Sequence, residues 1–254
     1  MKDNEMEGAK CAACDRTRGD PKNALRYVKA ILAGEQHVQV EARLFNYAIA
    51  TAAVLVVAGA LVYSALLPAT PDTAAYLPLF LLTIISAVAI VFSYTHIMHY
   101  GKSLSCANGM MVGMIMGMLS GFMAGALLGA TNGMFIGSVG GMAVGIVLGG
   151  NLGRIVGVMG ALEGIMAGLM SGIMGAMTSV MMLNDNLVAF LYISSGLCVF
   201  MLGGLSYMMH REAGDAPIQE RSVRFREFLL AGIILSLALV GIMLYGPKGP
   251  VVYP

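Results

Sequence analysis

The sequence has 254 residues, of which 58% are hydrophobic and 11% charged, with a net charge of +1 and no Trp. Soluble domains carry about 25% charged residues, so the composition excludes an ordinary soluble domain and indicates a membrane protein. The near-zero net charge gives no electrostatic attraction to nucleic acid, and we expect no nucleic-acid partner.

Residues 1–44 form a polar segment that we expect to be cytoplasmic or interfacial, without a cleavable signal peptide. Within it, ALRYVKAILAGE predicts a short amphipathic helix with Gly34 as its stop. Seven apolar segments long enough to cross a bilayer follow. Their predicted ranges are 45–67, 76–98, 106–129, 133–152, 156–182, 187–209 and 226–246. The fold class is therefore an all-α membrane domain over 45–246, with a tail at 247–254.

Lys and Arg residues gather in the polar segment and in alternate loops, with Lys248 in the tail as the exception. Such residues are enriched on the cytoplasmic side. With seven spans, this pattern predicts a cytoplasmic N-terminus and a C-terminus outside.

Thirteen glycines stand at four-residue intervals from Gly109 to Gly157, and the series resumes from Gly160 to Gly172. Glycine lets helices approach closely in a bilayer, and GxxxG is the signature of such packing. The pattern predicts a glycine-zipper core over 106–182. The glycines to which we assign helix packing are Gly109, Gly113, Gly117, Gly121, Gly125, Gly137, Gly141, Gly145, Gly164, Gly168 and Gly172.

Four residues turn a helix by about 400°, so the glycine stripe rotates by about 40° at each step. A rotating stripe favours crossed, right-handed contacts over a parallel seam. Small residues also lie on more than one face of these helices. We therefore expect a closely packed trio of helices or assembly around a symmetry axis.

Methionine is concentrated in the same region, and Met159, Met166 and Met170 form a row with Glu163 in the fifth span. Thioethers are soft ligands that favour Cu(I), and an ionisable group inside a membrane indicates a functional site. This row predicts an ion path. The alternative is that the methionines fill space beside glycine and that Glu163 is protonated and hydrogen-bonded.

Sulfur and imidazole side chains indicate a second soft-metal candidate on the cytoplasmic side. Cys11 and Cys14 form a CxxC pair, and His96 and His99 share one helix face near Cys106. These five residues could bind Cu(I) or Zn(II). The alternatives are an interfacial role for the histidines and a redox role for the CxxC pair. Cys198 is most simply a buried small side chain.

Residues 105–186, with the segments ATNGMF and EGIMAG, resemble poorly characterised prokaryotic Gly/Met-rich membrane proteins. Some of these resemble membrane portions associated with cupredoxin domains. The resemblance implies a prokaryotic cell membrane and a link to copper.

No catalytic constellation is visible, and we expect no enzymatic activity. Our first hypothesis is a metal-handling membrane protein that transports or transfers Cu(I). The second is a structural or accessory subunit of a larger membrane complex, and a thiol redox sensor is a third. A homo-oligomer or a complex with other subunits fits the packing glycines.

Overall fold

A computed structural model of the chain describes residues 46, 49–57, 77–100, 106–213 and 225–246. The chain divides into two units, Met1–Asn46 and Tyr47–Pro254, and nearly all described residues lie in the second. The predicted amphipathic helix, Cys11, Cys14 and the tail lie outside the described residues. The described part contains helices and no strand.

Six long helices are described, and residues 49–57 form a further helical segment. Their bounds are α4 Leu77–Tyr100, α5 Cys106–Asn132, α6 Met134–Gly153, α7 Val158–Met181, α8 Leu187–Ala213 and α9 Phe225–Tyr245. The predicted ranges of these six differ by at most four residues, at the end of α8. Helices α4 to α8 are long and apolar enough to cross a membrane, and α9 contains a shorter apolar stretch, Phe228–Met243.

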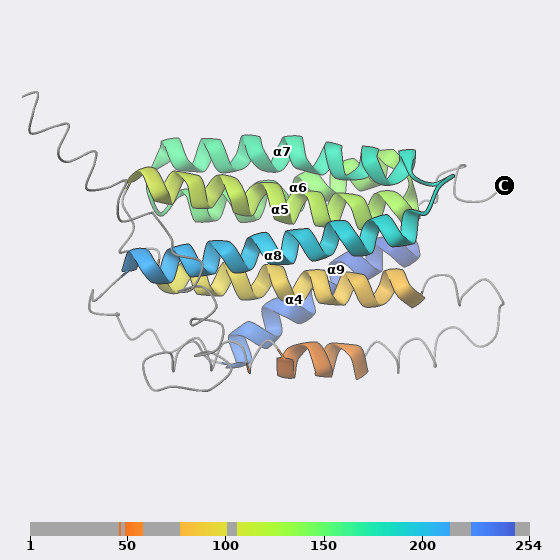
Figure 1. The fold of residues 1–254 in the computed structure, drawn as a ribbon, viewed down its shortest axis with the longest axis horizontal. Coiled ribbons are helices and arrows are strands. Elements are labelled where there is room, and N and C mark those ends of the chain that lie inside the picture. Colours follow the sequence, from red (N-terminus) through yellow and green to blue (C-terminus); the bar gives the residue numbers. More distant parts are fainter. Residues whose placement is uncertain (1–45, 47–48, 58–76, 101–105, 214–224, 247–254) are drawn as a thin grey trace, which may run out of the picture. The chain divides into compact units, whose positions relative to one another are not determined.

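Two glycines make the turns that connect α5 to α6 and α6 to α7. Gly133 alone separates α5 from α6, and its φ of 87° lies in the region that favours glycine. Gly157, with φ of 125°, precedes α7. Because both connections are this short, α5, α6 and α7 are antiparallel in succession and pack on one another (Figure 1).

The glycines of α5, α6 and α7 meet in five layers, each with one small residue from each helix. At the central layer, a Cβ atom placed on Gly145 would lie 2.7 Å from the Cα of Gly168 and 3.0 Å from that of Gly121. No other residue type fits there without moving a backbone. The layers are Gly113–Gly153–Gly160, Gly117–Gly149–Gly164, Gly121–Gly145–Gly168, Gly125–Gly141–Gly172 and Gly129–Gly137–Ala176.

The stripe on α5 rotates along the helix, as the four-residue spacing predicts. The atoms nearest to a Cβ at Gly113 all belong to α6, whereas those nearest to a Cβ at Gly125 all belong to Gly172 of α7. Two helices that cross through a rotating glycine stripe would separate on either side of the crossing point. Here α5, α6 and α7 do not separate in this way. As the glycine stripe of α5 turns away from α6, it comes to face α7. Glycine packing therefore continues along the whole length of the stripe.

The remaining helices pack around α4, which contacts α5, α8 and α9 (Figure 1). One core cluster joins the C-terminal half of α4, including Ile90 and Ile97, to α5 and to the C-terminal half of α8. A second cluster joins Leu79 and Leu82, at the start of α4, to Leu191 at the start of α8. Helices α4 and α8 therefore run in the same direction.

The layered packing predicts that an alanine is harmful at an inner glycine and harmless at an exposed one. A Cβ at Gly149 would lie 2.6 Å from the carbonyl oxygen of Gly164 and 2.8 Å from the Cα of Gly117, and neither backbone can yield. Overpacking a dense core costs about 1–3 kcal/mol. Thermal melts of the purified protein should show a clear loss of stability for Gly149→Ala.

Gly196→Ala and Gly203→Ala are matched controls on α8, because no atom lies within 4 Å of a Cβ at either site. Their stability should be unchanged or slightly raised, since alanine favours helix by about 1 kcal/mol over glycine. Equal losses at inner and outer positions would contradict the layered packing.

Candidate functional site

The proposed path of methionines lies on the outside of the trio. Every buried residue of α7 is Gly, Ala or Ser, so the long side chains of this helix occupy the opposite face. Met159 is 69% exposed, Met166 66% and Met170 56%. These methionines therefore face outward from the trio, and the ion path stays a prediction. We name the outward side of α7, with Met159, Glu163, Met166 and Met170, the methionine face.

Glu163 is partly exposed and lies nearer to the helix end than the sequence suggests. Counting from Arg154 along a continuous helix places it about 13 Å deep. Residues 154–157 form a turn, however, and α7 begins at Val158. Glu163 therefore lies about 7.5 Å into α7, at 1.5 Å per residue. No hydrogen bond or ion pair joins its carboxylate to another described residue.

Of the five metal candidates that the sequence predicts on the cytoplasmic side, only His96 has a described side chain. His96 is 1% exposed, and its ring stacks on that of Phe92 with centroids 6.1 Å apart. His96 is therefore packed inside the protein, one turn before α4 ends at Tyr100, and its interfacial role stays a prediction. His99 and Cys106 belong to α4 and α5, but their side chains lie outside the described ones. Within the described residues, no three His, Cys, Asp or Glu side chains form a metal-binding group.

Sulfur-containing side chains are also buried between α4, α5 and α8, where the sequence predicts no metal site. Met116, Met123, Cys198 and Met209 belong to one apolar cluster there. Cys198 is a free, buried thiol, as predicted. The cluster packs these side chains against Ile, Leu and Val, which is the ordinary use of methionine as a flexible filler.

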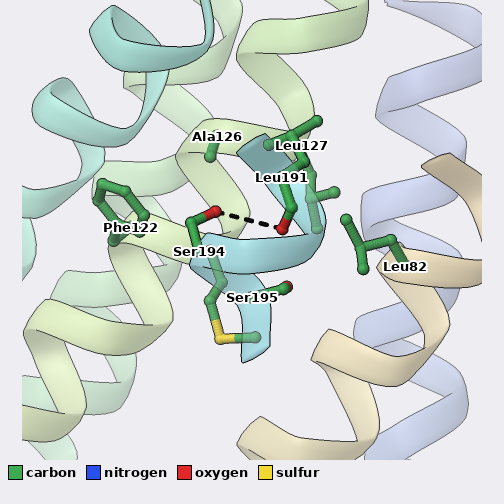
Figure 2. Close-up of a pocket in the computed structure, with 8 residues that line it drawn as sticks. Leu82, Phe122, Ala126, Leu127, Leu191, Ser194 and Ser195 are labelled. Carbon is green, nitrogen blue, oxygen red and sulfur yellow. Dashed lines mark hydrogen bonds between the residues drawn. The ribbon is translucent and has the colours of Figure 1, made fainter. Parts of the chain in front are cut away.

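A small cavity lies beside this cluster, between α4, α5 and α8 (Figure 2). Its volume of about 10 Å³ is close to the minimum for one water molecule. Ser194 and Ser195 supply its hydroxyl groups, and Ser194 Oγ donates to the carbonyl oxygen of Leu191 at 3.2 Å. The hydroxyls of Ser195 and Ser86 are hydrogen-bonded at 3.3 Å, which links α8 to α4.

Two further polar contacts between helices have no clear signal in the sequence. The Nδ2 atom of Asn132, the last residue of α5, donates to the carbonyl oxygen of Ile242 in α9 at 3.0 Å. Ser171 Oγ of α7 donates to the carbonyl oxygen of Gly117 in α5 at 3.2 Å. A small polar residue inside a GxxxG pattern is a weak signal for such a bond.

The arrangement has three parts: an interlocked glycine core, an outward methionine face and a polar contact between α4 and α8. No family model, curated protein or solved structure matches the chain. The resemblance of residues 105–186 to Gly/Met-rich membrane proteins stays a prediction.

Proposed function

We propose that the chain is a structural subunit of a membrane complex, with the α5–α6–α7 trio as its rigid scaffold. The glycine layers support this proposal, because backbones that meet without side chains between them cannot rearrange without losing contact. Lipid tails are as apolar as leucine, so van der Waals packing of this kind holds helices together in a bilayer.

Glu163 supports the methionine face as the surface that another polypeptide chain covers. A carboxylate inside a span almost always faces protein or water, because lipid solvates it poorly. Glu163 is partly exposed and has no partner among the described residues. A neighbouring chain with a hydrogen-bond donor at this level would satisfy it. Methionine side chains suit such a surface because they adapt their shape to a partner.

Photo-crosslinking in the native membrane tests this surface. A benzophenone amino acid replaces Met166 on α7 in one variant and Phe200 on α8, which is 80% exposed, in the control. We expect protein adducts from position 166 and lipid adducts from position 200. Mass spectrometry of the adduct distinguishes a second copy of this chain from a different subunit. Lipid adducts alone from both positions would refute the proposal.

Soft-metal binding is the second candidate, and the thioether row on the methionine face favours it. Met159, Met166 and Met170 present sulfur outward with Glu163 among them, and thioethers favour Cu(I) over hard cations. In an assembly, this row would lie at a contact between chains. Transport of Cu(I) would then depend on the oligomer.

Replacing the three methionines by leucine separates the two candidates, because leucine keeps the apolar surface and removes the sulfur. Titration of the purified protein with Ag(I), a soft substitute for Cu(I), should show fewer bound ions in the Met159→Leu/Met166→Leu/Met170→Leu variant if the row binds metal. Unchanged stoichiometry with intact assembly would exclude the metal site and leave the scaffold.

A further inference from the structure

Two buried hydroxyl groups in the contact between α4 and α8 lack a hydrogen-bond partner among the described residues. Ser93 of α4 is 1% exposed and Ser206 of α8 is 7% exposed, and the Oγ atom of each is fully buried. Most buried hydroxyl groups in proteins are hydrogen-bonded to protein or to ordered water. These two are therefore exceptions that call for a partner.

Helix geometry places both serines on the surface where α4 meets α8. The hydrogen bond between Ser86 and Ser195 fixes one point of this contact. Ser93 follows Ser86 by seven residues and Ser206 follows Ser195 by eleven, which are nearly whole numbers of turns, each within about 20°. Ser93 thus shares the face of Ser86, and Ser206 shares the face of Ser195.

The two serines lie about one helical turn apart in height. Because α4 and α8 are parallel, Ser93 lies about 10 Å and Ser206 about 16 Å beyond the Ser86–Ser195 bond, at 1.5 Å per residue. Their neighbours confirm this: Ile90 and Ile97, on either side of Ser93, belong to the same apolar cluster as Leu205 and Met209. The offset along the helices is about 6 Å, which is a lower limit for the distance between the two hydroxyls. One water bridge spans about 5.6 Å and a chain of two water molecules about 8.4 Å.

We propose that Ser93 and Ser206 bind one or two bridging water molecules between α4 and α8. With the Ser86–Ser195 bond and the cavity beside Ser195, this site forms a polar strip. The strip runs from the middle of α4 toward its C-terminal end, where His96 is buried. Hydroxyl and water oxygens are hard ligands, so the strip is chemically distinct from the methionine face and independent of the proposed scaffold role.

A double-mutant cycle on the full-length protein in lipid nanodiscs tests the bridge. If water joins the two hydroxyls, Ser93→Ala and Ser206→Ala should each lower the melting temperature, by about 2–4 °C. The melting temperature of the double variant should be no lower than that of the less stable single variant, because either change already breaks the same network. If instead each change raises or leaves unchanged the melting temperature, or if the two shifts add, the proposal is wrong.

Two controls calibrate the cycle. Ser86→Ala and Ser195→Ala should be coupled, since their hydroxyls are bonded directly. Thr178→Ala on α7 should add to Ser93→Ala, because the Thr178 hydroxyl bonds to its own helix. As an independent readout, water-edited solid-state NMR should transfer polarisation to the Ser93 side chain faster than to Thr83, which is buried and bonds to the carbonyl oxygen of Leu79. Equal transfer to both would overturn the proposal.

Discussion

The close approach of three helix backbones is the constraint on which the rest of the structure depends. Helices α5, α6 and α7 meet through glycine, so each backbone lies where a Cβ atom of its neighbour would otherwise be. A stripe repeated every four residues cannot face one straight neighbour for long, since it rotates by about 40° per step. With three helices the stripe on α5 stays buried, because it faces α6 at one end and α7 further along.

The same constraint determines where the large side chains go. With small residues in every buried position of α7, its methionines and leucines must lie outside. The α7 side of the trio's interior therefore consists of glycine, alanine and serine, whereas its exterior is rich in thioethers. Chemistry that involves the methionines consequently belongs to the surface of the trio and to whatever chain or lipid contacts it. Inside one chain, by contrast, serine hydroxyls of α4 and α8 and the ring of His96 are buried.

The sequence predicts the described helices well because apolar length is a local property. The fourth predicted range begins at Gly133, where the chain turns with a φ that favours glycine. The direction in which the methionines point cannot be predicted from the sequence, because the same spacing occurs on the inner and on the outer face of a helix. The burial of His96 depends on how far α4 extends and on what covers it, and the bond from Asn132 to Ile242 joins residues 110 positions apart. Neither has a local pattern.

Solid-state NMR of the protein in bilayers, with ¹³C at glycine Cα atoms, tests the glycine core most directly. If the layers exist, assigned correlations should join Cα atoms of different helices, such as those of Gly121, Gly145 and Gly168. Correlations confined to glycines four residues apart on the same helix would contradict the close approach of the three backbones.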